Sequence, residues 1–68
     1  MSSVARVTTI TARSETSFED AIRTGIERAS STLRNVEGAW VKEQKVDVDN
    51  GTVRSWHVTL EVTFVLDD

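Results

Sequence analysis

Residues 52–66 read Thr-Val-Arg-Ser-Trp-His-Val-Thr-Leu-Glu-Val-Thr-Phe-Val-Leu. From residue 56 onward every second side chain is apolar: Trp56, Val58, Leu60, Val62, Phe64 and Leu66. Successive side chains of a β-strand point to opposite faces, so this alternation predicts a strand whose apolar face packs against a helix. The strand is far longer than the usual length of about five or six residues. Because one short helix cannot cover it all, we expect neighbouring subunits to cover the rest.

The turn before this strand, Asp49-Asn50-Gly51, carries the strongest short-range signal for a β-hairpin. Residues 39–48 therefore form a second strand, which pairs antiparallel with the first. Strict alternation places Trp40, Lys42 and Gln44 on one face of this strand, and Val41, Glu43 and Lys45 on the other. Neither face is cleanly apolar, so we expect a β-bulge or an edge strand at an interface.

The first part of the chain predicts a strand followed by a helix. Residues 4–14 are rich in β-branched side chains, which favour a strand. Ser17 with Asp20, or Thr16 with Glu19, can then form a capping pair that starts a helix near residue 18. Apolar residues and one glycine recur at helical spacing: Phe18, Ile22, Gly25, Ile26, Ala29 and Leu33. This spacing predicts a helix with one buried face.

Two features of the helix indicate how it packs and ends. Gly25 costs about 1 kcal/mol relative to alanine in a helix interior, which indicates the close approach of another backbone. Arg34, Asn35 and Gly38 supply a basic last turn and a stop. We therefore predict a single α+β domain over residues 1–68, strand-helix-strand-strand, with a three-stranded antiparallel sheet wrapped around one helix.

Length and composition favour an oligomer. A chain of 68 residues has a thin hydrophobic core, and this one has no cysteine for disulfides and one histidine. Self-association is then the favoured route to stability. The net charge is −3, which argues against nucleic acid as a partner. No signal-like or membrane-spanning apolar run is visible, so we expect a cytoplasmic protein that does not bind membranes.

The sequence does not predict an enzyme. No serine or threonine stands at a recognisable motif spacing from a histidine and a carboxylate, and the three glycines form no phosphate loop. Trp40 follows the helix stop and is either an interface side chain or a flat binding platform. Trp56 is expected to pack in the core, and His57, on the opposite face, to be solvated or at an interface.

The chain resembles the dodecin family over essentially its whole length. The resemblance is carried by Ser-Glu-Thr-Ser-Phe-Glu-Asp-Ala-Ile at 14–22, Ala-Ser-Ser-Thr-Leu-Arg-Asn-Val at 29–36, Gly-Ala-Trp at 38–40, the Asp-Asn-Gly turn and the last strand. It implies a dodecin-like subunit, twelve copies of which form a hollow sphere of cubic symmetry. It also implies a bound flavin, either FMN or riboflavin and less typically FAD, that is stored and not turned over.

The resemblance also implies the residues of a flavin site. The flavin ring stacks on the tryptophan that corresponds to Trp40, and a glutamine of the last strand normally holds the polar edge of the ring. In this chain His57 stands where the glutamine is usual. Gln44, Lys45 and Lys42, on the strand of Trp40, complete the set of candidate cofactor-binding residues. No catalytic residue is expected, and the sequence does not settle whether metal ions bind.

Two other functions stay open at this point. The oligomer could be structural, with Trp40 filling an interface and no flavin bound. It could also be a cage for another ligand, such as a coenzyme A derivative held by Lys42, Lys45 or Arg54. If His57 does contact flavin, a neutral imidazole makes one good hydrogen bond where an amide makes two, and a titrating histidine predicts affinity that changes between about pH 5.5 and 7.5.

Overall fold

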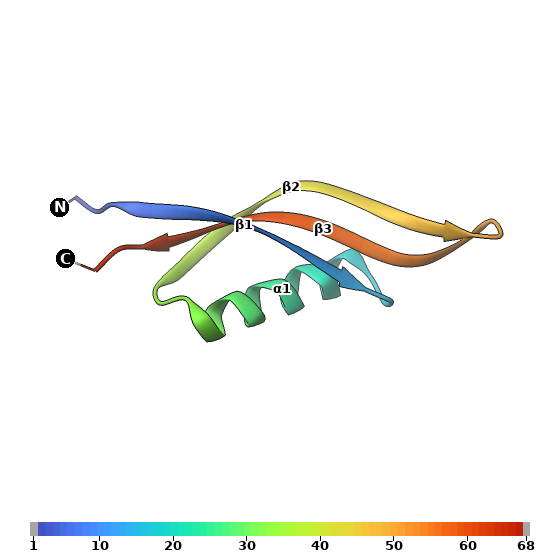
Figure 1. Cartoon of the computed structure of the whole chain (residues 1–68), viewed down its shortest axis with the longest axis horizontal. Helices are drawn as coiled ribbons and strands as arrows, with labels where there is room; N and C mark the ends of the chain where they lie inside the picture. The colour runs from blue at the N-terminus through green and yellow to red at the C-terminus, as the bar shows by residue number, and fades with distance from the viewer. Residues whose placement is uncertain (1, 68) are drawn as a thin grey trace.

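The computed structural model describes residues 2–67, which form three strands and one helix. Strand β1 spans Ala5–Ser14, helix α1 Phe18–Thr32, strand β2 Val36–Asp49 and strand β3 Thr52–Val65 (Figure 1). The predicted order of strand, helix, strand, strand is confirmed. β2 begins three residues before the expected start at residue 39, because Val36 already pairs with Phe64 of β3.

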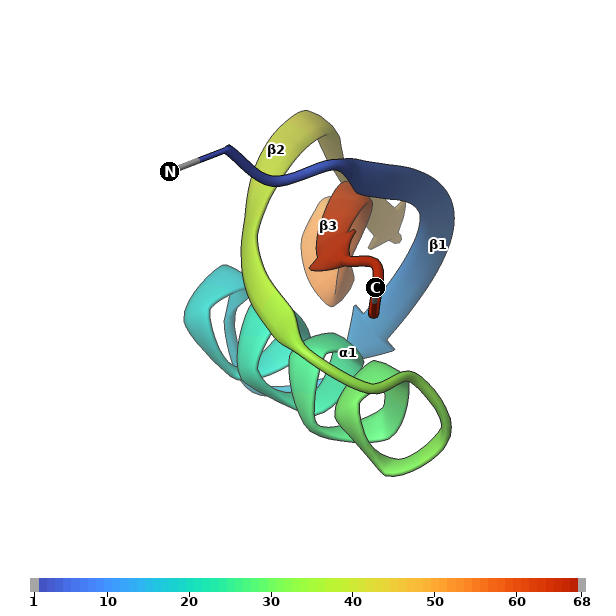
Figure 2. The same ribbon diagram turned by 90° about the vertical axis from the view of Figure 1, so that its left-hand side faces the viewer.

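The strands form one antiparallel sheet in the order β1-β3-β2, so the last strand of the chain is the central one. Both edge strands curve around the same side of β3, and α1 lies under the concave face (Figure 2). The predicted α+β class, with a three-stranded sheet wrapped around one helix, is confirmed. Among residues 2–67, no helix is long and apolar enough to cross a membrane.

The hydrophobic core lies between β3 and α1. Val58, Leu60 and Val62 of β3 are buried against Ala21 and Ala29 of the helix. The partly buried residues around this core are Ile10, Ala12, Phe18, Ile22, Ile26, Leu33 and Val36. The alternation in β3 thus identifies the face that packs on the helix. The sequence pattern missed Ala21, which faces the sheet between Phe18 and Gly25.

Gly25 marks a close approach of the helix to the sheet. A Cβ atom at this position would lie 3.1 Å from the Cβ of Ala12 and 3.1 Å from a methyl group of Leu60. These distances are tighter than ordinary contacts between carbon atoms. The helix does approach the sheet closely at Gly25, but the near atoms belong to side chains of β1 and β3 and not to another backbone as the sequence had indicated.

The start of the helix is fixed by serine side chains. Ser17 is the N-cap, and its hydroxyl accepts a hydrogen bond from the backbone N–H of Asp20 at 3.0 Å. The Asp20 carboxylate accepts from the hydroxyl of Ser14 at 2.7 Å, and that hydroxyl accepts in turn from the backbone N–H groups of Thr16 and Ser17. Ser17 is thus the cap of the two that the sequence allowed, and Ser14 extends the network.

The end of the helix differs from the prediction. The last turn contains no basic residue, because the helix stops at Thr32, before Arg34. Asn35, with φ 63°, makes the left-handed turn, and Gly38 lies within β2. Asparagine tolerates this backbone conformation because its short side chain can bond locally. The Asn35 amide also donates to the backbone carbonyl of Val65 and to the carboxylate of Asp67, which ties the turn to the chain end.

A β-bulge interrupts β2 between Val41 and Glu43. Val41 lies opposite Leu60 and Glu43 opposite Thr59, so Lys42 is an additional residue without its own partner on β3. A bulge reverses the alternation of side chains beyond it. Of the two alternatives expected here, the bulge is confirmed, and β2 is also an edge strand of the sheet. The bulge changes which residues share a face.

The predicted grouping of side chains on β2 is wrong for this reason. By register, Trp40, Glu43 and Lys45 lie opposite Glu61, Thr59 and His57, on the face of the sheet that points away from α1. Val41 and Gln44 lie opposite Leu60 and Val58, on the face toward the helix. Strict alternation had placed Trp40 with Gln44 and apart from Lys45.

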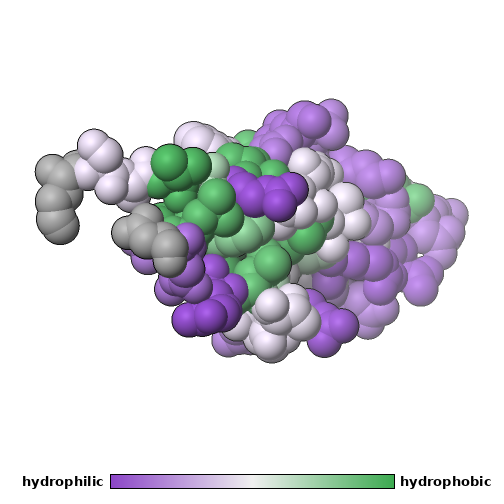
Figure 3. All heavy atoms as spheres, turned by 60° about the vertical axis from the view of Figure 1, so that its left-hand side comes forward, coloured by the Kyte–Doolittle hydropathy of each residue, from purple (hydrophilic) through white to green (hydrophobic). Residues whose placement is uncertain are grey.

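The β2–β3 hairpin extends beyond the helix and gives the molecule extents of 52 × 19 × 14 Å (Figure 1). Its turn has positive φ at Asn50 and Gly51, 53° and 78°, as a two-residue hairpin loop requires. Exposed valines lie on β2 at Val41 and in two further places. Val46, Val48 and Val53 lie on the projecting hairpin, and Val4 and Val7 lie near the chain ends. Apolar side chains gather on the surface near the chain ends, and the hairpin end is more hydrophilic (Figure 3).

Candidate functional site

The candidate residues lie mainly on the face of the sheet that points away from α1, which we call the outer face. On β3 this face carries His57, Thr59, Glu61 and Thr63, which alternate with the buried residues of the core. None of these four is fully buried. In a single subunit the outer face is therefore open to a ligand or to another subunit.

Trp40 is the largest apolar group at this surface. It lies on the edge strand β2 opposite Glu61, and 64% of its surface is exposed. Packing in the subunit core does not account for an indole that exposed, because large aromatic side chains normally bury most of their area. Trp40 is therefore available as a flat stacking surface on the outer face.

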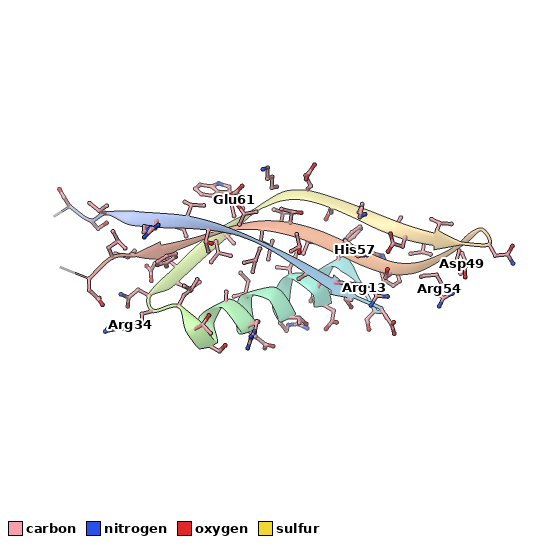
Figure 4. All side chains as sticks on the ribbon, in the orientation of Figure 1. Arg13, Arg34, Asp49, Arg54, His57 and Glu61 are labelled. Atoms are coloured by element: carbon pink, nitrogen blue, oxygen red, sulfur yellow. The ribbon has the colours of Figure 1, made fainter. Side chains whose placement is uncertain are left out.

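Glu61, beside Trp40, is held by two neighbours. The Thr9 hydroxyl donates to one carboxylate oxygen at 3.0 Å, and the Lys42 ammonium lies 3.6 Å from the other. Glu61 lies near the middle of the sheet, and His57 lies nearer the hairpin (Figure 4). Lys42, the extra residue of the bulge, is thus paired with a carboxylate of its own subunit.

A second part of the candidate site surrounds His57. A cavity of about 450 Å³ is lined by Thr11, Glu43, Gln44, Lys45, His57, Val58 and Thr59. Three of the five predicted residues, Gln44, Lys45 and His57, meet here. Gln44 reaches this cavity although its position by register is toward the helix.

Trp40 and Lys42 do not line this cavity. The partner of Trp40, Glu61, lies four residues along β3 from His57, which corresponds to about 13 Å at roughly 3.3 Å per residue. The five residues therefore form two groups along one face in a single chain. A larger cavity of about 490 Å³ lies between α1 and β1, and none of the five lines it.

Asp47 and Ser55 are the residues near this site that the sequence did not predict. His57 Nε2 lies 2.7 Å from Asp47 Oδ2 and 3.3 Å from the Ser55 hydroxyl oxygen. The Ser55 hydroxyl donates to the same Asp47 oxygen at 3.1 Å. Hydrogen bonds from His57 and then from Ser55 hold the pKa of the Asp47 carboxyl below its ordinary value. The carboxyl is therefore a charged acceptor at neutral pH.

These three residues do not have the geometry of a hydrolytic triad. In such a triad the serine contacts one imidazole nitrogen and the carboxylate contacts the other. Here Ser55 and Asp47 both contact Nε2, and Ser55 is only 1% exposed. The cluster orients His57 and offers no accessible nucleophile. Among residues 2–67, no group of three or more histidine, cysteine, aspartate or glutamate side chains is placed to hold a metal ion.

Known proteins with the same fold identify the family. A sequence model of the dodecin family matches residues 4–67. A dodecin from Streptomyces davaonensis is 38% identical, with 100% of each chain covered and a TM-score of 0.92. A dodecin from Streptomyces coelicolor is 30% identical, with 97% of this chain and 94% of that chain covered and a TM-score of 0.90.

A third similar structure, from Mycobacterium tuberculosis, is described as a calcium-chelating immunodominant antigen, calcium dodecin, with a novel calcium-binding site. It is 33% identical, with 96% of this chain and 93% of that chain covered and a TM-score of 0.80. No match was found among curated protein sequences. The family match covers nearly the whole chain, and the strand order and the single helix agree with it, so this chain belongs to the dodecin family.

Proposed function

We propose that this chain binds and sequesters a flavin, riboflavin or FMN, in the cytoplasm and without catalysing a reaction. The observation that carries the proposal is Trp40, an indole 64% exposed on the outer face of an edge strand. An isoalloxazine ring is flat and aromatic, and it gains dispersion and offset-stacking energy against such a surface. The expectation that Trp40 stacks on a flavin comes from the chain's membership of the dodecin family.

His57, Gln44 and Lys45 are the proposed polar contacts. They line one cavity on the same face of the sheet as Trp40. Lys45 is the better candidate for the phosphate of FMN, because Lys42 is already paired with Glu61. The two groups of residues would act on one ligand only if the ligand extends along β3 or if neighbouring subunits contribute, and the family's assembly favours the second arrangement.

We propose that the binding form is a closed oligomer, most simply of twelve subunits. Val46, Val48 and Val53 are exposed on the part of the hairpin that the helix does not cover. β2 is an edge strand, which an isolated subunit leaves open to pairing or covering. Closed symmetry buries such surfaces and protects such edges. The same closure would place copies of the exposed Trp40 against one another or around a shared ligand.

Calcium is the second candidate ligand, because the similar protein from Mycobacterium tuberculosis is described as calcium-chelating. Calcium takes six to eight oxygen ligands, commonly from several carboxylates. Residues 2–67 of one chain bring no group of three such side chains together. A calcium site here would therefore need carboxylates from several subunits, whereas an exposed indole that could stack on a flat ligand is present in each subunit. For this reason we favour flavin.

The experiment is a flavin titration of the purified protein, with its mass measured by light scattering in the same buffer. We expect an oligomer that quenches the fluorescence of added riboflavin or FMN, with and without a calcium chelator. A colourless oligomer that quenches neither flavin would refute the flavin proposal and favour a structural role or a coenzyme A ligand. A folded 7.6 kDa monomer at micromolar concentration would refute the proposed assembly.

A further inference from the structure

His57 is held at one edge of its imidazole ring by two groups of its own subunit. Asp47 Oδ2 lies 2.7 Å from Nε2, and the Ser55 hydroxyl oxygen lies 3.3 Å from the same nitrogen. The imidazole side chain is 27% exposed, so part of the ring still reaches the surface.

Both contacts place the proton on Nε2. A carboxylate only accepts hydrogen bonds, so Nε2 must donate to Asp47. The Ser55 hydroxyl has one proton, which it donates to Asp47 at 3.1 Å, so toward Nε2 the serine oxygen is also an acceptor. The hydrogen bonds that lower the pKa of Asp47 keep the carboxyl ionised at neutral pH. A neutral His57 is then left with an unprotonated Nδ1.

His57 lines the cavity, and the two residues bonded to its Nε2 do not. In an imidazole, Nε2 and Nδ1 are separated by one carbon atom and their hydrogen-bonding directions diverge, so partners at Nε2 leave Nδ1 open to a different group. Asp47 and Ser55 lie on the hairpin side of His57 and do not line the cavity, whereas His57, Thr59 and Glu43 do. Asp47 and Ser55 occupy Nε2, so Nδ1 is the ring nitrogen of His57 that is left for a ligand in the cavity.

We propose that Asp47 and Ser55 fix the proton of His57 on Nε2, so that the cavity receives Nδ1 as a bare hydrogen-bond acceptor. The site then selects flat ligands that carry an N–H group on the facing edge. This inference rests on the proposed function, because the imide N–H of the flavin pyrimidine ring is such a group. A carboxamide at this position could instead accept one hydrogen bond and donate another side by side. The histidine therefore restricts the site to a smaller range of ligands.

The first test determines directly which ring nitrogen of His57 carries the proton, and it needs no ligand. The chain contains one histidine, so protein labelled with ¹⁵N at histidine gives signals from His57 alone. At about pH 8.5, where ordinary histidine is neutral, we expect the shifts of a protonated Nε2 and an unprotonated Nδ1. A proton on Nδ1, or an even mixture of both forms, would overturn the proposal whether or not flavin binds.

The second test compares riboflavin with riboflavin methylated at its imide nitrogen, at the same pH. Methylation removes the N–H, so we expect wild-type protein to bind the methylated ligand about tenfold more weakly. Asp47→Asn places an amide against Nε2 that can donate, which favours the other tautomer, as with the corresponding change in hydrolytic triads. In this variant we expect the preference to fall to about threefold or less.

Asp49→Asn is the matched control. It makes the same chemical change on the same strand, but Asp49 pairs with Arg54 at the hairpin end, away from His57 (Figure 4). It should keep the wild-type tautomer and the wild-type preference for the unmethylated ligand. If Asp47→Asn also keeps that preference, methylation acts by steric hindrance alone and the selection is refuted. If neither ligand binds the wild type, the flavin proposal fails, and the ¹⁵N shifts still decide the tautomer.

Discussion

Replacing Trp40 by alanine should remove most of the flavin affinity and leave the subunit folded. Trp40 contributes little to the core, because it lies on the outer face of an edge strand and is 64% exposed. The buried core of β3 and α1 does not include it. The variant thus separates ligand binding from folding more cleanly than a change in β3 would.

The size of the loss follows from the exposed area of Trp40. A tryptophan side chain has about 250 Å² of surface, and 64% exposure leaves about 160 Å² of it open to solvent. A flat ligand covers one of the two ring faces, roughly 80 Å², which is worth about 2 kcal/mol at about 25 cal/mol per Å². Offset stacking adds about 0.5–1.5 kcal/mol. The sum, about 3 kcal/mol, corresponds to a loss of affinity of roughly a hundredfold.

The assay is quenching of flavin fluorescence during titration of wild type, Trp40→Ala and Trp56→Phe. Trp56 lies opposite Ser14 and Val46, on the helix side of the sheet, and is only partly exposed. Trp56→Phe should therefore bind within about threefold of wild type. The stacking argument is refuted if Trp40→Ala binds within about threefold of wild type, or if Trp56→Phe is the variant that loses binding.

Three further predictions concern stability. Leu60 is 0% exposed at the centre of β3. Leu60→Ala should therefore lower the free energy of unfolding by about 2–5 kcal/mol in denaturant titrations. A loss below about 1 kcal/mol would contradict the assigned core. Gly25→Ala gains about 1 kcal/mol of helix propensity, but the new methyl group crowds neighbours at 3.1 Å, at a cost of about 1–3 kcal/mol. The melting temperature should therefore stay level or fall. A rise in the melting temperature would show that α1 can move away from the sheet. For Asp47 the folded pKa is lowered, so its stabilising contribution is present above its unfolded pKa of about 3.9 and is lost as the pH falls through the folded value. The melting temperature of Asp47→Asn should therefore lie below that of wild type at pH 7 and approach it below about pH 4; a gap of constant size would show that the charge of Asp47 is irrelevant.

The sequence alone determined the elements, because the signals for them are local. Alternation along β3 identified the core face, since a strand has a side-chain period of two, and Val58, Leu60 and Val62 are indeed buried. The Asp-Asn-Gly turn identified the hairpin, because Asn50 and Gly51 tolerate the positive φ values that the turn adopts. The glycine in the helix indicated a close approach, although the near neighbours are side chains and not the expected backbone.

The arrangement of the candidate site was predictable only in part. The resemblance to dodecins supplied Trp40 and His57 as candidates, and Gln44, Lys45 and Lys42 were added from the strand of Trp40. The structure gathers Gln44, Lys45 and His57 around one cavity. Their distribution over the two faces of β2 was predicted wrongly. The bulge that includes Lys42 adds one residue, which moves Lys45 to the face of Trp40 and His57.

Only the tertiary structure revealed Asp47 and Ser55 as partners of His57. Counting back from the Asn50-Gly51 turn in regular register would place Asp47 opposite Arg54, with its side chain on the face opposite to that of His57. Another of the register shifts, between Asp47 and Val48, instead places Asp47 opposite Ser55. A one-residue shift reverses the face of every side chain beyond it, and the shift depends on how the twisted edge strand fits β3 over its whole length. Propensity and periodicity are properties of short segments, so they determined which strands form. The register between two strands is a property of the pair, and it decided which side chains meet.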